Sequence, residues 1–294
     1  MNHSRSKSVY LVTYEHIVKG LRQVGVTAGS SMMLHSSLKS LGYVENGAQT
    51  VIKALMDVLT PEGTLLLPSF NHGIPFRKGG QGYFHPNETP TTNGIIPDTF
   101  WRMSGVYRSL NPTHSFAAWG KHSRQYVEFH HQTLTMGPKS PLGLLYANGG
   151  FCLLLGVDYR SNTFHHVVEM STGAPCLGLR TEAYPMVLPD GRIVEGRTWS
   201  LREKSCHFTD GGKYYEEMES RNLQREVRIG RSRGILFQLQ DCFEVIAEIL
   251  RRGKNGFPPC FRCSTRPRQV PHTVPSDWDI QKQRLFTESA AWSY

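Results

Sequence analysis

One short segment of the chain carries side chains that could act together as a general base. Thr163-Phe-His-His166-Val-Val-Glu169 places a histidine three residues before a carboxylate, and positions i and i+3 share one face of a helix. A carboxylate that accepts a hydrogen bond from one ring nitrogen fixes the imidazole tautomer and raises the basicity of the other nitrogen. His166 and Glu169 therefore predict an oriented base, and the Thr163 hydroxyl is a candidate oxyanion donor. His165 with Glu169 is an i,i+4 alternative, and a surface pair on an amphipathic helix is the non-catalytic interpretation.

A second group of polar side chains follows an expected strand at residues 31–35. The segment 34–42, LHSSLKSLG, offers hydroxyl groups and backbone N–H donors to an anion or a carbonyl group. A serine N-cap is the structural alternative for this segment. The loops NPTHSFAA (111–118) and GPKSPL (137–142) have a constrained composition, but neither indicates a function by itself.

The elements that must position these residues alternate between helices and strands. Apolar spacing predicts helices over residues 15–24, 48–59, 95–103, 163–170 and 235–251, and strands over 31–35, 64–68 and 151–157. Pro189-Asp-Gly191 is typical of a hairpin turn between residues 184–188 and 192–195. Residues 31–68 match the strand–helix–strand unit of parallel sheets. The pattern indicates an α/β fold with a mixed β-sheet flanked by helices.

Length and composition indicate a globular enzyme. The chain has 294 residues, of which 39% are hydrophobic and 19% charged, so a sizeable core is expected. We expect a single α/β domain over residues 1–265 and a proline-rich C-terminal tail over 266–294. Its apolar runs are much shorter than the about 20 residues of a membrane span. No apolar leader is visible at the N-terminus, so a cytoplasmic protein without membrane partners is expected.

The net charge of +9 favours anionic partners, but no nucleic-acid motif accompanies it. We therefore expect no nucleic-acid partner, although a binding protein that uses its basic C-terminal third remains an alternative to an enzyme. A row of arginines is the most concentrated feature. It predicts either a site for an anionic acceptor or a solvated helix face, and consists of Arg221, Arg225, Arg228, Arg231 and Arg233.

Cysteines are the other candidate ligands. Cys260 and Cys263 have the spacing of half a zinc site, and Cys206 with His207 is a speculative second half. The spacing is irregular, so plain thiols and no metal are expected.

Several common enzyme motifs are missing from the sequence. It contains no P-loop, no G-x-G-x-x-G and no G-x-S-x-G, which argues against kinases, dinucleotide-dependent dehydrogenases and ordinary serine hydrolases. A covalent mechanism would need a nucleophile near His166, and the candidates are Ser36, Ser37 and Cys176.

Taken in order, these segments resemble the aminoglycoside 3-N-acetyltransferase family, antibiotic acetyltransferases outside the common acetyltransferase fold. The matching segments are HSSLKSLG (35–42), GTLLLPSF (63–70), NPTHSFAAWG (111–120), GPKSPLGLL (137–145), LLLGV (153–157) and TFHHVVE (163–169). The family pattern T-x-x-H-x-x-E falls on Thr163, His166 and Glu169. The resemblance covers about residues 10–200 and fades beyond them.

The resemblance implies a mechanism and a set of ligands. Acetyl-CoA would donate its acetyl group directly to an amine, with His166 as base, Glu169 as its carboxylate and Thr163 or a backbone amide as the oxyanion donor. Residues 30–170 would hold these motifs and the CoA contacts, which are His35, Ser36, Ser37, Leu38, Pro112, His114 and Ser115. The acceptor part would span about residues 175–265, with Asp210, Glu216 and Glu217 as its ligands. The implied partners are CoA and a small-molecule amine, with antibiotic resistance as the role and a homodimer as one candidate assembly.

One property departs from the family. Aminoglycosides are polycations, and a net positive field would repel them unless a local acidic pocket prevails. The sequence therefore leaves a second acceptor class open: an amine that also carries a carboxylate, phosphate or phosphonate group.

Overall fold

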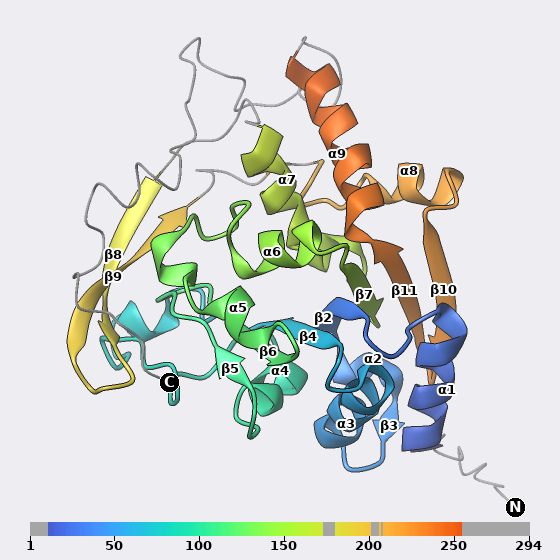
Figure 1. Ribbon diagram of the computed structural model, residues 1–294, viewed down its shortest axis with the longest axis horizontal. Coiled ribbons are helices and arrows are strands. Elements are labelled where there is room, and N and C mark those ends of the chain that lie inside the picture. Colours follow the sequence, from blue (N-terminus) through green and yellow to red (C-terminus); the bar gives the residue numbers. More distant parts are fainter. Residues whose placement is uncertain (1–10, 173–179, 201–205, 207, 255–294) are drawn as a thin grey trace, which may run out of the picture.

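A computed structural model describes residues 11–172, 180–200, 206 and 208–254. Its centre is a seven-stranded mixed sheet in the order β10-β11-β7-β2-β4-β6-β5 (Figure 1). The parallel strands are β2 (Ser31–Ser36), β4 (Thr64–Pro68) and β7 (Phe151–Leu155). The strands that pair antiparallel on either side are β5 (Tyr107–Arg108), β6 (Phe116–Gly120), β10 (Gln224–Ile229) and β11 (Ser232–Gln238).

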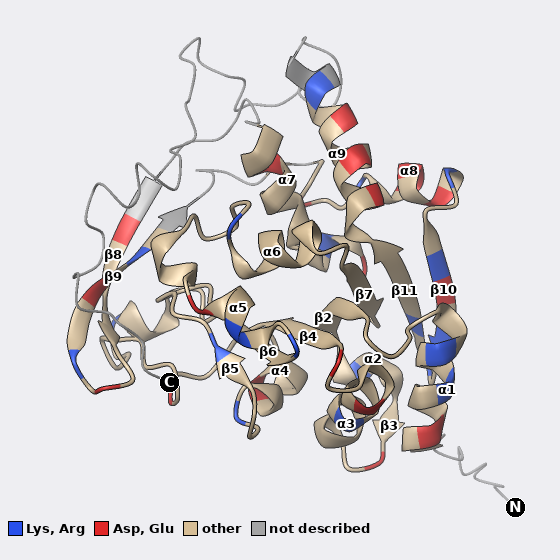
Figure 2. Ribbon diagram, in the orientation of Figure 1, with Lys and Arg blue, Asp and Glu red and all other residues tan. Residues whose placement is uncertain are grey.

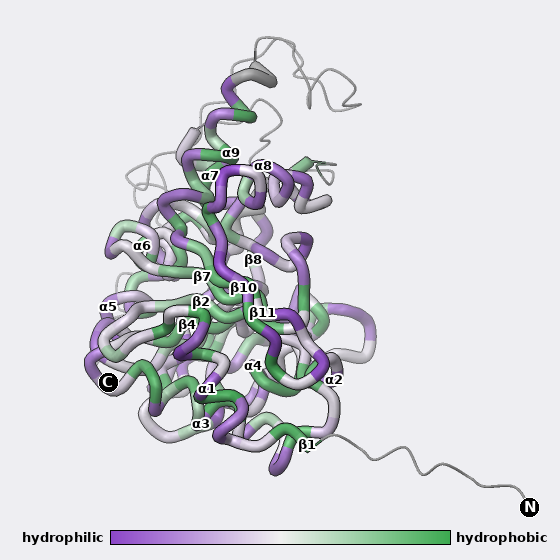
Figure 3. Tube along the Cα trace, turned by 90° about the vertical axis from the view of Figure 1, so that its right-hand side faces the viewer, coloured by the Kyte–Doolittle hydropathy of each residue, from purple (hydrophilic) through white to green (hydrophobic). Residues whose placement is uncertain are grey.

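Helices cover both faces of this sheet (Figure 1). One face packs on α1 (Tyr14–Val24), α3 (Ala48–Leu59) and α4 (Ile95–Phe100). The other packs on α6 (Pro141–Ala147), α7 (Phe164–Thr172) and α9 (Leu239–Lys254). Neighbouring residues of one strand belong to opposite cores: Leu153 and Leu155 face α1 and α3, whereas Cys152 and Leu154 face α7 and α9. Strands buried on both faces are continuously apolar, as the green central segments of Figure 3 show.

The smaller elements lie around this sandwich. Two further sheets have two strands each. One joins β1 (Leu11–Val12) to β3 (Tyr43–Val44), and the other joins β8 (Arg180–Val187) to β9 (Ile193–Ser200). The short helices are α2 (Leu38–Leu41), α5 (Ser123–Val127), α8 (Tyr215–Ser220) and the 3-10 turns Ile74–Phe76, His130–Gln132 and Tyr159–Ser161. Among the described helices none is long and apolar enough to cross a membrane.

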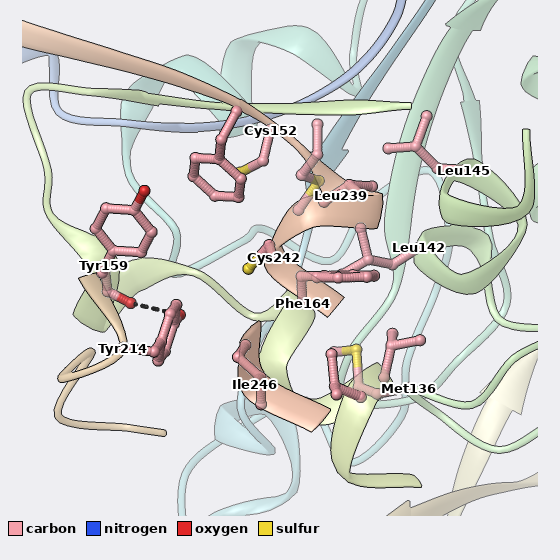
Figure 4. Close-up of a cluster of buried hydrophobic side chains, with 14 of the residues drawn as sticks. Met136, Leu142, Leu145, Cys152, Tyr159, Phe164, Tyr214, Leu239, Cys242 and Ile246 are labelled. Carbon is pink, nitrogen blue, oxygen red and sulfur yellow. Dashed lines mark hydrogen bonds between the residues drawn. The ribbon is translucent and has the colours of Figure 1, made fainter. Parts of the chain in front are cut away.

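The beginning of α7 is fixed from inside the core. Phe164 is fully buried in the hydrophobic cluster that also contains Leu142, Leu145 and Cys242 (Figure 4). Buried Asn162 accepts a hydrogen bond from the Phe164 backbone N–H at 3.1 Å, which satisfies one of the unpaired amides at the start of a helix. Its amide nitrogen donates to the Tyr214 hydroxyl at 3.0 Å. The direction in which α7 projects its polar side chains is therefore set by buried contacts.

The predicted α/β fold is confirmed, including the parallel β2–α3–β4 unit and the β8–β9 hairpin. The helix expected from residue 235 is wrong at its start, because residues 235–238 belong to β11 and α9 begins at Leu239. An apolar run such as Ile235–Phe237 suits either element, and pairing with β7 decides for a strand. The helix face, one of two alternatives for the arginine row, is also wrong, since four of the five arginines lie in or between β10 and β11. Cys260, Cys263, Cys176, His207 and the tail 266–294 lie outside the described residues.

Candidate active site

The structure brings together His166 and Glu169 on α7, as the spacing of the two residues predicts. His166 Nδ1 lies 3.1 Å from Glu169 Oε2. Glu169 is fully buried, and its other oxygen accepts a hydrogen bond from the buried Thr209 hydroxyl at 2.6 Å. A buried carboxylate is stable only where hydrogen bonds replace its hydration, and the contacts with His166 and Thr209 are those hydrogen bonds. The His166 side chain remains 24% exposed, so substrate can approach its ring.

His35 places the end of β2 beside the start of α7. Its Nε2 accepts a hydrogen bond from the Thr163 backbone N–H at 3.4 Å and lies 3.4 Å from the Thr163 hydroxyl. β2 and β7 are adjacent and parallel, so the residues that follow them meet at one edge of the sheet, where α/β proteins bind ligands. Burial, with a smaller contribution from the neighbouring His165, lowers the pKa of His35 to about 3. His35 is therefore neutral near pH 7.

His165 makes a separate pair next to the first. Its Nε2 lies 3.0 Å from Asp210 Oδ1, and its ring centroid is 4.1 Å from that of His166. Asp210 also accepts a hydrogen bond from the Cys206 backbone N–H at 2.6 Å. Of the two histidine–glutamate pairings that the spacing allowed, the structure therefore hydrogen-bonds His166 to Glu169, while His165 bonds Asp210.

His114 brings the loop 111–118 to the same site. Burial, with smaller contributions from the neighbouring His72, His166 and His130, lowers its pKa to about 3. Its ring packs against Phe70 with centroids 5.1 Å apart, and its Nδ1 lies 2.8 Å from the Thr113 hydroxyl. The loop thus presents a neutral imidazole in the neighbourhood of His166.

The remaining predicted CoA contacts divide into two groups. Ser36 ends β2, and Ser37 precedes α2, which begins at Leu38; the Ser37 backbone N–H donates to the Leu155 carbonyl at 3.0 Å. These residues lie at the edge of the sheet that carries His35. Ser115, in contrast, is completely buried: its hydroxyl donates to the Ser69 carbonyl and accepts from the Arg108 guanidinium.

Ser115 and Pro112 therefore support the loop from within. The Pro112 carbonyl accepts a hydrogen bond from the Asn71 side chain at 2.9 Å, and Arg108 also donates to the carbonyls of Ser69, Pro86 and Thr89. Burial lowers the pKa of Arg108 to about 9. A cofactor contact through the Ser115 side chain does not fit this burial.

The predicted acceptor ligands are not brought together. Asp210 lies at the site through His165, whereas Glu216 and Glu217 belong to the exposed helix α8, where Glu217 pairs with Arg221. Conversely, sequence reasoning missed Thr209. Forty residues separate it from Glu169, and no spacing rule links a lone threonine to a carboxylate at that distance.

The arginine row lies elsewhere on the molecule. Arg221 pairs with Glu217 and Glu248, and Arg233 pairs with Glu226. Arg225 lies against Gly25, which follows α1, and Arg231 against Gly42, which follows α2. Figure 2 shows basic residues of this arginine row along β10, and the acidic residues of α8 and α9 near them. The arginines therefore do not provide an anion site at His166.

Comparison with known proteins identifies the family. The aminoglycoside 3-N-acetyltransferase family model matches residues 33–251. The aminoglycoside N(3')-acetyltransferase-like protein YokD of Bacillus subtilis is 31% identical over 252 residues, which cover 79% of this chain and 90% of that protein. The crystal structure of YokD covers 84% of this chain and 96% of its own, with a TM-score of 0.75 and 28% identity.

A third similarity is to a variant of aminoglycoside acetyltransferase AAC(3)-IVa in complex with gentamicin. It has a TM-score of 0.70 and 27% identity, and covers 87% of this chain and 96% of that one. The predicted resemblance is thus confirmed over most of the chain. The chain belongs to the aminoglycoside 3-N-acetyltransferase family and is an N-acetyltransferase whose donor is acetyl-CoA.

Proposed function

We propose that His166 is the general base that deprotonates the acceptor amine, with Glu169 as its orienting carboxylate. The observation that carries this proposal is the 3.1 Å contact between His166 Nδ1 and the fully buried Glu169. A carboxylate at this position favours the tautomer with the proton on Nδ1, so the basic lone pair lies on Nε2. The negative charge of Glu169 also stabilises the imidazolium that forms when Nε2 takes the proton.

Acetyl transfer then proceeds in two steps, addition of the amine and loss of the thiolate. The neutral amine attacks the thioester carbonyl, a C–N bond forms, and His166 Nε2 takes the proton that the nitrogen loses. The tetrahedral intermediate collapses, the C–S bond breaks, and the proton passes to the thiolate of CoA. The Thr163 hydroxyl is the proposed donor to the oxyanion, because it lies at the start of α7 on the side of His35.

We propose that CoA lies along the edge formed by His35, Ser36, Ser37 and Leu38, with His114 on the opposite loop. Both imidazoles are neutral near pH 7 because burial lowers their pKa to about 3. They therefore offer ring faces and single hydrogen bonds to the donor and add no positive charge to the place where an ammonium group must arrive.

The local charge favours a cationic acceptor. Two carboxylates, Glu169 and Asp210, lie within this site, whereas four of the five arginines of the row lie on the β10–β11 hairpin. A local field of this sign outweighs the distant +9, because exposed charges are screened over about 10 Å at 0.1 M salt. We propose an aminoglycoside amine as the acceptor, with Asp210 as a contact for one of its ammonium groups.

The test is acetyl-CoA turnover against a panel of amines, with the acetylated product detected by mass spectrometry. The panel pairs aminoglycosides such as gentamicin with amines of similar size that carry a carboxylate or phosphonate. Turnover of the aminoglycosides, with Asp210→Asn raising their KM more than that of acetyl-CoA, supports the proposal. Turnover of the anionic amines alone would contradict the proposed acceptor.

A further inference from the structure

We infer that the base of this enzyme is also a zinc-binding site, at which Zn²⁺ acts as an inhibitor. One ligand atom from each of His165, His166 and Glu169 lies within 4.8 Å of the other two. Nothing else among the described residues forms such a group of metal-binding side chains. The inhibitory part of the inference depends on the proposed role of His166, whereas the binding part does not.

The distances suit a tetrahedral ion after small side-chain movements. Zinc binds imidazole nitrogen and carboxylate oxygen at about 2.0–2.2 Å, which places two ligands of one tetrahedron about 3.4 Å apart. His166 Nδ1 and Glu169 Oε2 are already 3.1 Å apart. One ligand atom of His165 lies within 4.8 Å of a ligand atom of each of these residues, so side-chain rotation must bring the three atoms closer together.

The environment of His165 provides a second, independent indication of a metal ligand. Its side chain is 4% exposed, and its Nδ1 is buried without a hydrogen-bond partner among the described residues. A buried imidazole nitrogen without a partner costs free energy, and a coordinated ion would remove that cost. Asp210 occupies the opposite nitrogen, Nε2, so Nδ1 is the atom that His165 would offer to the ion.

The surroundings provide the supporting contacts that zinc sites require. In such sites a ligating histidine donates its other N–H to a carboxylate, and a ligating carboxylate is itself hydrogen-bonded. Asp210 holds His165 in this way, and Thr209 holds Glu169 Oε1. The exposed part of His166 gives the ion an entry path and leaves the fourth position to water. Two nitrogens and one oxygen suit zinc better than magnesium or calcium.

Coordination and base catalysis exclude one another at this site. An ion on His166 Nδ1 displaces the proton from that nitrogen, so the neutral ring carries its proton on Nε2. Nε2 then has no lone pair to accept the proton of the amine. Acetyl transfer should therefore stop in proportion to zinc occupancy.

Equilibrium dialysis with ZnCl₂ alone, without CoA, measures binding independently of catalysis. The full chain should bind one equivalent that His165→Gln loses. Asp210→Asn should weaken that equivalent by about 10- to 100-fold, the usual effect of losing a residue that orients a metal ligand. Two control variants should retain the bound zinc. One is His122→Gln, which changes a histidine outside the cluster, and the other is the double variant Cys260→Ser/Cys263→Ser. Because Asp210→Asn changes none of the three proposed zinc ligands, zinc binding by this variant tests the site even where His165→Gln fails to fold.

Inhibition is then measured as the rate at which acetylated product forms at increasing ZnCl₂ concentrations. A chelator in large excess over the enzyme buffers the concentration of free zinc. The half-inhibiting concentration should rise about 10-fold or more in Asp210→Asn but stay unchanged in His122→Gln. Equal zinc binding by wild type and His165→Gln, or loss of the ion in Cys260→Ser/Cys263→Ser only, would overturn the site. Zinc bound at His165 without inhibition would keep the site and refute His166 as the base.

Discussion

Replacing Glu169 by glutamine tests the proposed base with little change of shape. Glutamine keeps the volume of the fully buried side chain and an oxygen that can face either His166 or Thr209. The substitution removes the charge that stabilises the imidazolium in the transition state. When the amide nitrogen faces His166, it also favours the tautomer with the proton on Nε2, which cannot act as a base.

The magnitude follows from the hydrogen bond that is lost. A hydrogen bond to a charged group is worth about 1.5–3 kcal/mol. Since 1.36 kcal/mol is a factor of ten in rate, kcat should fall by about 10- to 160-fold. His166→Ala removes the base itself, so its loss should be larger, within the range of about 10²–10⁴ that general-base catalysis contributes.

The assay is steady-state acetyl transfer measured between pH 5 and 9. The acidic limb of the kcat profile should move to lower pH in Glu169→Gln, because the ring no longer has a buried negative charge to stabilise its protonated form. Glu62→Gln, at an exposed ion pair with Lys121, is the matched control and should leave both kcat and the profile unchanged. An unmoved acidic limb, or an unchanged kcat in Glu169→Gln, would refute the orienting role of Glu169.

Three other outcomes follow from the structure. His166→Ala should reduce kcat while the Kd for CoA, measured by calorimetry, stays nearly unchanged; retention of most activity would exclude His166 as the base. Thr209→Val removes the 2.6 Å hydrogen bond to Glu169 and should lower the free energy of unfolding by about 1.5–3 kcal/mol, together with kcat but not the KM for acetyl-CoA; urea denaturation that shows no loss would contradict that contact. His35 and His114 have a folded pKa of about 3, below the ordinary value of 6.5, so the unfolded chain binds protons first as the pH falls. Their contribution to stability is complete above pH 6.5 and is lost between pH 6.5 and 3, and a melting temperature that stays flat over that range would contradict two neutral buried histidines.

Much of the framework could be predicted because its signals are local. α3 and β4 have the expected bounds, since apolar residues at helical spacing and a short apolar run after Pro61-Glu-Gly63 each specify one element. The same holds for the proposed base: residues three apart on a helix share a face, so a helix at 163–170 suffices to bring His166 to Glu169.

Burial could not be predicted for residues whose partners lie far along the chain. Ser115 is a polar residue in a polar loop, and only the guanidinium of Arg108 and the carbonyl of Ser69 make it an internal support. The strand at Ser232–Gln238 depends in the same way on β7, whose edge needs hydrogen-bond partners that the chain supplies more than seventy residues later.

The sequence by itself thus determined elements such as α3 and β4, the family and the His166–Glu169 pair, because each depends on neighbours within one helix or strand or on motifs read in order. Only the tertiary structure decided the contacts that complete the site: Thr209 on Glu169, Asp210 on His165, and His35 beside Thr163. It also decided the sign of the local charge, by placing four of the five arginines on the β10–β11 hairpin and two carboxylates next to His166. The physical reason is that a buried charge selects its partners by distance in space, and separation along the chain carries no information about that distance.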